Sequence, residues 1–174
     1  MQTAVEKAKK IRLLILDVDG ILTCGKIFGG NDDNEKSFHI HDGMGIKLLQ
    51  RSGIDVALLS GKKSASVAKR AAELGIEHAY LGFEDKVPTY ETLKNTLKLS
   101  DDAIAYMGDD LPDLPLLIRA GLAISVPNAP SYIQKHADMI TVKPGGDGAV
   151  REACEFILHA QDKFDAIVAN YVNR

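Results

Sequence analysis

The chain has 174 residues, two cysteines and a formal net charge of −3, from 24 acidic and 21 basic side chains. Its length suits one domain over residues 1–174, the slight acidic excess argues against a nucleic-acid partner, and the widely separated Cys24 and Cys154 exclude a disulfide framework. No apolar stretch reaches the ~18 residues that span a membrane, and the charged N-terminus lacks a signal peptide's apolar segment, so we expect a cytoplasmic protein without a membrane partner.

The first expected element is a buried strand over residues 11–16 that ends in two carboxylates. Four apolar residues, 13–16, run directly into Asp17, Asp19 and Gly20, and such a run followed by a turn predicts a buried strand. Ligands of open α/β sheets bind beyond the carboxyl ends of the strands. Because two carboxylates repel each other, we expect a cation between them. Asp17 is the candidate nucleophile, and Asp19 is the candidate proton donor and acceptor.

Residues 24–41 differ from the rest of the chain and predict a β-hairpin inserted after the first strand. Glycines and a polar tip at 31–34 separate two short apolar segments, 26–28 and 37–40. His39 and His41 would then share one face of a strand. They are candidates for a metal pair, although a surface or interface position is favoured.

The remaining pattern predicts an α/β fold with a mostly parallel sheet flanked by helices, because strands alternate with helical patterns. Further strands are expected over residues 55–59, 78–81, 104–107, 122–125 and 139–141, and helices over 64–74 and 88–98. The tail, residues 162–174, either extends the final helix or is mobile.

Polar groups recur where further strands end. Ser60 follows the second strand, Lys86 the third, and the acidic segment 108–113 the fourth. The carboxyl ends of parallel strands meet at one edge of a sheet, so these groups can converge. They would supply a carboxylate nucleophile, oxygen ligands for Mg²⁺ and donors for phosphoryl oxygens, which suits phosphoryl transfer through an aspartyl-phosphate.

The order of these groups resembles the four motifs of the haloacid dehalogenase superfamily: Asp17–Gly20, Ser60, Lys86 and Gly108–Asp113. The whole chain is similar to the family of 3-deoxy-D-manno-octulosonate 8-phosphate (KDO 8-phosphate) phosphatases, through segments 41–49, 108–111 and 145–152. This resemblance implies a Rossmann-like fold without a large cap domain, Mg²⁺ as cofactor and a sugar-acid phosphate as substrate. It also implies a role in lipopolysaccharide precursor synthesis.

The resemblance further implies how the reaction is divided among the residues. Asp17 attacks phosphorus, and Asp19 protonates the leaving oxygen and then activates water. The carboxylates of Asp17 and Asp109 and the backbone carbonyl of Asp19 would hold Mg²⁺. An aspartate at position 19 favours a phosphatase over dehalogenases and ion pumps of the superfamily.

Four further residues would support this centre. Ser60 and Lys86 would bind the phosphoryl oxygens that are not transferred. Asp110 and Asp113 would orient Lys86 or a metal-bound water.

Candidate substrate contacts come from two segments: Gly61, Lys62 and Lys63 after the second strand, and Arg151 near the glycines at 145–148. The family pattern has arginine followed by lysine where this chain has Lys62 and Lys63. Lysine lacks the planar fork that binds a carboxylate bidentately. A nine-carbon, sialic-acid-type sugar 9-phosphate is therefore an alternative substrate.

The resemblance implies a homotetramer in which the hairpins pack together and a neighbouring subunit completes each site. Phe28, Phe38 and Ile40 are the candidate contacts, since an isolated hairpin is marginal in water. The tail would cover a neighbouring site. Two other classes remain open: a phosphoryl-accepting receiver-like module, in which the phosphoaspartate persists as a signal, and a catalytically silent scaffold.

Overall fold

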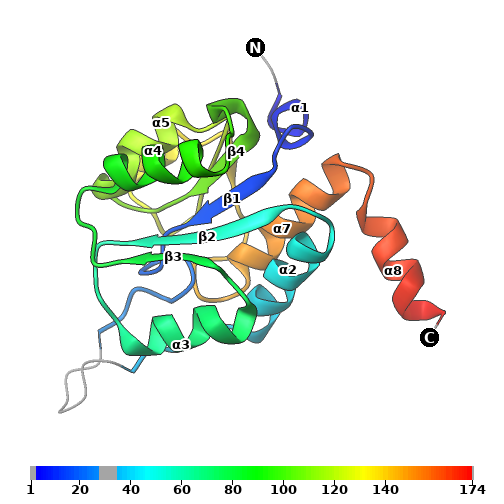
Figure 1. The fold of residues 1–174 in the computed structure, drawn as a ribbon, viewed down its shortest axis with the longest axis horizontal. Coiled ribbons are helices and arrows are strands. Elements are labelled where there is room, and N and C mark those ends of the chain that lie inside the picture. The colour runs from blue at the N-terminus through cyan, green and yellow to red at the C-terminus, as the bar shows by residue number, and fades with distance from the viewer. Residues whose placement is uncertain (1–2, 28–34, 174) are drawn as a thin grey trace.

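The structure, a computed structural model, describes residues 3–27 and 35–173. At its centre lies a sheet with strand order β3-β2-β1-β4-β5-β6, and every pairing is parallel (Figure 1). The strands are β1 (Leu13–Leu16), β2 (Asp55–Ser60), β3 (His78–Leu81), β4 (Ile104–Met107), β5 (Leu122–Ser125) and β6 (Met139–Ile140). The expected α/β class and parallel sheet are thus confirmed, with strand boundaries within two residues of those expected.

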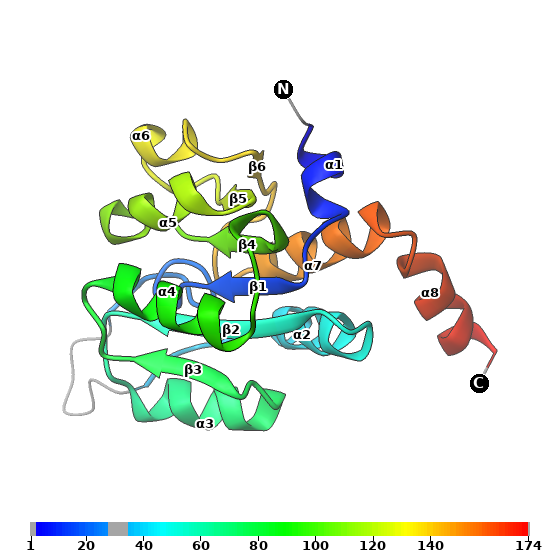
Figure 2. The same ribbon diagram turned by 45° about the horizontal axis from the view of Figure 1, so that its top comes forward.

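Helices cover both faces of this sheet (Figure 2). α2 and α7 pack against each other on one face, and α4 and α5 lie together on the opposite face. The helices are α1 (Ala4–Ala8), α2 (Ile40–Arg51), α3 (Ala65–Leu74), α4 (Lys86–Thr96), α5 (Leu114–Arg119), α6 (Ser131–Gln134), α7 (Ala149–Ala160) and α8 (Phe164–Val172), with 3₁₀ turns η1 (Asp101–Ala103) and η2 (Leu111–Asp113). No helix in the described part of the chain is long and apolar enough to cross a membrane.

The strand order places β1 at the topological switch point. From β1 the chain builds outward through β2 and β3 on one side, and through β4, β5 and β6 on the other. All four residues of β1 are fully buried, as the apolar run predicts. Open α/β sheets bind ligands at such a point, beyond the carboxyl ends of the strands. Asp17 and Asp19 directly follow β1 there.

Helix starts also place site residues. The Asp85 carboxylate accepts the Val87 N–H and caps α4, so that Lys86 is the first residue of the helix. The helix was expected two residues later, and the earlier start carries the Lys86 side chain into the buried part of the carboxyl edge.

The described part of residues 24–41, where a β-hairpin was expected, contains no strand. The tip at 28–34, with Phe28, lies outside the described residues. His39 is the N-cap of α2 and His41 lies in its first turn, so the expectation that both share a strand face is wrong. Their rings nevertheless contact edge to face, with centroids 5.1 Å apart.

The helix α2 was missed because its first turns contain Gly43 and Gly45, which read as a loop. The glycines serve packing instead. A Cβ at Gly45 would lie 3.0 Å from Arg151 Cα, so the close approach of α2 and α7 needs a residue without a side chain. Tertiary packing against α7 therefore outweighs the low helix propensity of glycine.

The C-terminal tail forms a separate helix. Asp162, with a φ of 54°, ends the turn after α7, and α8 follows as a separate helix at one side of the molecule (Figures 1 and 2). There Tyr171 of α8 accepts a hydrogen bond from Arg51 of α2 at 2.9 Å, and Phe164 and Ile167 pack against the core. No described residue of α8 is buried, although several are apolar. The tail thus does not extend α7.

Candidate active site

A cavity of about 550 Å³ opens at the carboxyl edge of the sheet. Most residues that the sequence singles out line it: Asp17, Asp19, Ser60, Gly61, Lys62, Lys86, Asp109, Asp110 and Asp113. Gly25, Glu84 and Pro112 also line it and were not anticipated. Residues from four strand ends therefore meet in one place, as the parallel sheet requires.

The centre of the cavity is a buried ammonium between two carboxylates. Lys86 Nζ donates to Asp17 Oδ1 and to Asp113 Oδ1, each at 2.6 Å. The Lys86 side chain is only 3% exposed. Burial alone would lower the pKa of Lys86, but the charges of Asp17 and Asp113 outweigh it and raise that pKa above its usual value. Lys86 is therefore a permanent cation next to the candidate nucleophile.

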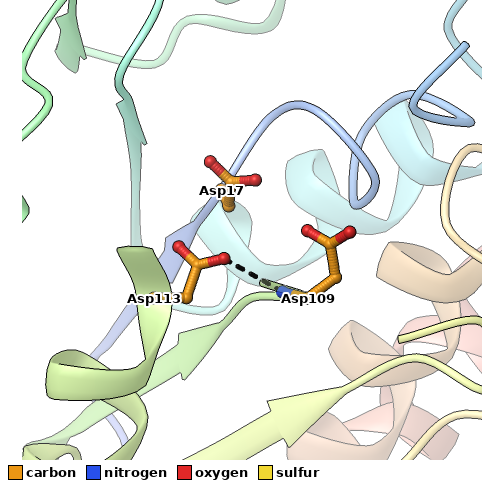
Figure 3. Close-up of side chains that lie close together, drawn as sticks. All are labelled: Asp17, Asp109 and Asp113. Atoms are coloured by element: carbon orange, nitrogen blue, oxygen red, sulfur yellow. Dashed lines mark hydrogen bonds between the residues drawn. The ribbon is translucent and has the colours of Figure 1, made fainter. Parts of the chain in front are cut away.

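Asp113 holds this arrangement in place. Its Oδ1 also accepts the hydroxyl of Tyr106 at 2.6 Å. Its Oδ2 accepts the backbone N–H of Asp109 at 3.0 Å (Figure 3) and that of Asp110 at 3.1 Å. Both oxygens are thus engaged, which suits the orienting role expected for Asp113.

Tyr106 is a site residue that sequence reasoning missed. It is completely buried in β4, and its hydroxyl lies between Asp113 and Lys86, 3.4 Å from Nζ. A buried hydroxyl needs a hydrogen-bond partner. A tyrosine in an otherwise apolar strand directly before the acidic segment is the signal that could have found it.

Three carboxylates form a cluster that fits a divalent cation. Oxygens of Asp17, Asp109 and Asp113 lie within 4.8 Å of one another (Figure 3). Asp109 Oδ1 is buried without a hydrogen-bond partner in the described chain. Carboxylate oxygens are the ligands that Mg²⁺ prefers. Since both Asp113 oxygens are engaged, the carboxylates of Asp17 and Asp109 are the ones free to bind a metal ion.

The electrostatics of this cluster point the same way. Burial, together with the charge of Asp113, raises the pKa of Asp17 to about 7 even beside Lys86. Burial, together with the charges of Asp17 and Asp113, likewise raises the pKa of Asp109 to about 7. The three carboxylates outnumber the one ammonium in the cluster, so a bound cation would relieve their repulsion.

The glycine of the first motif, Gly20, makes room for Asp109 of the fourth motif. A Cβ at Gly20 would overlap the carboxylate of Asp109. Gly20 also has a φ of 95°, in the left-handed region that favours glycine. Any side chain there would displace a candidate metal ligand.

Three other predicted site residues, Asp19, Ser60 and Asp110, also line the cavity but lie outside the carboxylate cluster. The Asp19 side chain is 28% exposed and forms an ion pair with Lys36. Ser60 Oγ accepts the Lys62 N–H at 3.2 Å, which turns the chain after β2. Asp110 is exposed, and its carboxylate accepts the Leu111 N–H at 2.8 Å, so it caps η2.

Lys63 and Arg151 do not line the cavity. The stem of Lys63 lies against Gly82, where a Cβ would overlap it. Arg151 Nε donates to Glu155 Oε1 at 2.6 Å, and its backbone N–H donates to Asp42 Oδ1 at 2.8 Å. Substrate contact by either residue stays a prediction.

Asp42 was also not anticipated. Its carboxylate, on α2, is almost completely buried and accepts a backbone N–H in the first turn of α7. Burial raises the pKa of Asp42. This contact caps α7 from a neighbouring helix, a structural role that leaves the cavity unchanged.

Comparison with known proteins identifies relatives of the whole chain. Residues 80–152 match the family of haloacid dehalogenase-like hydrolases. The chain is 43% identical over 162 residues to the 3-deoxy-D-manno-octulosonate 8-phosphate phosphatase of Yersinia pestis, covering 92% of this chain and 87% of that protein.

Solved structures agree with this relationship. The phosphatase of the same name from Moraxella catarrhalis, crystallised with a magnesium ion, a phosphate ion and a KDO molecule, is 45% identical, with a TM-score of 0.93 over 97% of each chain. The cobalt-bound deoxy-D-mannose-octulosonate 8-phosphate phosphatase of Haemophilus influenzae is 39% identical, with a TM-score of 0.87 over 90% of this chain and 92% of that one. The chain therefore belongs to the 3-deoxy-D-manno-octulosonate 8-phosphate phosphatase family of haloacid dehalogenase-like hydrolases.

Proposed function

We propose that this protein is a Mg²⁺-dependent phosphatase that hydrolyses KDO 8-phosphate to KDO and inorganic phosphate, a step in lipopolysaccharide precursor synthesis. The observation that carries the proposal is the buried Asp17–Lys86–Asp113 arrangement beside Asp109, in a chain of this family. Family membership gives no support to a receiver-like module or to a silent scaffold.

The first step forms an aspartyl-phosphate. An oxygen of Asp17 attacks phosphorus, the phosphorus–oxygen bond to the sugar breaks, and Asp19 gives its proton to the leaving sugar oxygen. Lys86 holds one oxygen of Asp17 by a 2.6 Å hydrogen bond and thereby aims the nucleophile. Its ammonium, with the hydroxyl of Ser60, also binds the negatively charged phosphoryl oxygens.

The second step releases phosphate. Water attacks phosphorus, its proton passes to Asp19, and the bond between phosphorus and Asp17 breaks. Asp17 is thereby restored as a carboxylate, and Asp19 carries the proton needed for the next cycle.

The residues present fit a magnesium ion, which would be held by the carboxylates of Asp17 and Asp109 and the backbone carbonyl of Asp19. When bound, Mg²⁺ neutralises charge between the anionic nucleophile and the phosphate. The unpartnered Asp109 Oδ1 supports this assignment. The relative from Moraxella catarrhalis contains magnesium, and that from Haemophilus influenzae contains cobalt, so the preferred ion is to be measured.

The sugar acid would be recognised at the rim, where Gly61 and Lys62 line the cavity. Lys62 is exposed there and offers one positive charge to a substrate carboxylate. Lys63 and Arg151 lie outside the cavity, so contact with substrate would require movement or a neighbouring subunit.

The direct test is phosphate release from KDO 8-phosphate, a nine-carbon sugar-acid 9-phosphate and simple sugar phosphates, each with Mg²⁺ and with EDTA. We expect Mg²⁺-dependent release with a preference for KDO 8-phosphate. Preference for the nine-carbon acid would keep the chemistry and change the substrate. Absence of metal-dependent release from every ester would overturn the proposal.

We further propose a single catalytic domain that assembles as a homotetramer in the cytoplasm. Residues 24–41 would form the contact between subunits, and α8 would cover a neighbouring site. Exposed apolar side chains support this proposal. Ile27 and Ile40 are exposed in the 24–41 segment, and Val168 and Val172 are exposed on α8. In this assembly contacts between subunits, and not an inserted cap domain, would close the cavity. Light scattering of the purified protein would give the subunit number, and a monomer would contradict this assembly.

A further inference from the structure

Asp19 has an ionic partner that none of the motifs contains. Lys36 Nζ donates a hydrogen bond to Asp19 Oδ1. In the described part of the chain, Lys36 makes the one hydrogen bond and the one ion pair recorded for the Asp19 side chain. The second carboxylate oxygen of Asp19 therefore stays free for a proton or a substrate.

The location of Lys36 separates it from the groups that meet a ligand. Asp19 lines the cavity, whereas Lys36 does not. The Lys36 side chain is 16% exposed and belongs to residues 35–39, the irregular connection that leads into α2. Lys36 is thus placed to act on the Asp19 carboxylate and not on a molecule within the cavity.

We infer that Lys36 is a positioning residue for Asp19, which fixes the orientation of the carboxylate by binding Oδ1 and leaves Oδ2 to exchange the proton. The inference rests on the proposed function. When the phosphorus–oxygen bond to the alcohol breaks, the proton moves from Asp19 to the alcohol oxygen. When water attacks the aspartyl-phosphate, a water proton returns to Asp19. Lys36 keeps its own protons throughout.

The loss of such a contact has a specific expected consequence. Without Lys36 the Asp19 carboxylate can rotate, and a misplacement of ~1 Å can reduce a rate by about a hundredfold. The defect should depend on the leaving group, because a strongly basic alkoxide needs a proton to depart and p-nitrophenolate does not.

The test compares Lys36→Met, Lys36→Arg and the control Lys9→Met, which removes an exposed charge at the end of α1, outside the cavity. The kcat/KM values are measured with KDO 8-phosphate, glycerol 3-phosphate and p-nitrophenyl phosphate. The value of kcat/KM reports only on the steps up to and including cleavage of the ester bond. We expect Lys36→Met to lower it about ten- to hundredfold for both alkyl phosphates and less than about twofold for p-nitrophenyl phosphate.

Lys36→Arg should recover much of the loss, because it keeps a cationic donor, and Lys9→Met should match the wild type. An equal loss with all three esters would overturn the inference, since it would indicate a general structural or phosphate-binding role. Loss with KDO 8-phosphate alone would also overturn it, because Lys36 would then contact the sugar acid. Values of kcat/KM for Lys36→Met equal to those of the wild type would also overturn the inference. A wild-type protein inactive on every ester would instead overturn the proposed function itself.

Discussion

Two ammonium–carboxylate pairs flank the reacting centre, and they are built differently. Lys86 and Asp17 have side chains that are 3% and 9% exposed; Lys86 is the first residue of α4, and Asp17 directly follows β1. Lys36 and Asp19 are 16% and 28% exposed, and both come from irregular segments. The first pair is fixed by further partners, Asp113 and Tyr106, whereas the second pair has no further recorded partner among the described residues.

This difference matches the roles proposed for the two carboxylates, nucleophilic attack by Asp17 and proton transfer by Asp19. A nucleophile must be held still, which the buried hydrogen bond from Lys86 achieves, and the Lys86 ammonium opposes the rise that burial causes in the pKa of Asp17. A group that gives and takes protons must reach both substrate and water, so partial exposure and one free oxygen suit it better. The comparison leads to four predictions, ordered from the largest expected effect to the smallest.

The largest effect should come from Asp17→Asn. The amide cannot form the aspartyl-phosphate, so kcat should fall by about 10⁴-fold or more. The fold should persist, because the change removes one of three mutually repelling carboxylates. Phosphate release and circular dichroism measure the two properties. Turnover close to wild type would remove Asp17 as the nucleophile.

Lys86→Met should reduce both activity and stability. It leaves Asp17 and Asp113 buried without their cation, and breaking a buried pair from one side costs about 3–5 kcal/mol. Lys36→Met breaks a partly exposed pair and should cost less than about 1 kcal/mol. Urea unfolding of the two metal-free variants measures both values. Equal destabilisation would contradict the contrast between the pairs.

Removal of the metal ion should make stability depend on pH. Asp17 and Asp109 have pKa values raised from 3.8 to about 7 in the folded protein. The folded state therefore binds more protons than the unfolded state between these values, so stability falls as the pH rises through this range. Mg²⁺ binds the ionised carboxylates and should offset the loss.

Thermal unfolding with Mg²⁺ and with EDTA, at about pH 5.5 and about pH 8, checks this linkage. The Tm in EDTA should be lower at the higher pH, and the gain from Mg²⁺ should be larger there. Asp17→Asn serves as the control, since it should weaken both trends. A metal-free Tm that rises between the two pH values would contradict the prediction.

The two pairs also differ in how far the sequence predicts them. Apolar runs fix the strands, and the parallel order brings their ends together, so the meeting of Asp17, Lys86 and Asp113 follows from the pattern. The Lys36–Asp19 contact does not follow, because no periodicity constrains the segment that carries Lys36. The helix α2 was missed for a related reason. Its glycines lower the local helix propensity, and the packing against α7 that stabilises the helix cannot be seen in the sequence pattern.

Tyr106→Phe should have the smallest effect. It removes one donor from Asp113, which keeps the Lys86 ammonium and two backbone N–H groups. A lost buried hydrogen bond costs about 1 kcal/mol, and Asp113 should orient Lys86 less firmly, so kcat should fall less than about tenfold. Tyr90→Phe is the matched control, because this buried tyrosine donates to Asp101, outside the cavity. Equal kcat values for both variants would place Tyr106 outside the catalytic network, whereas a loss confined to Tyr106→Phe would indicate that the hydroxyl supports the buried pair.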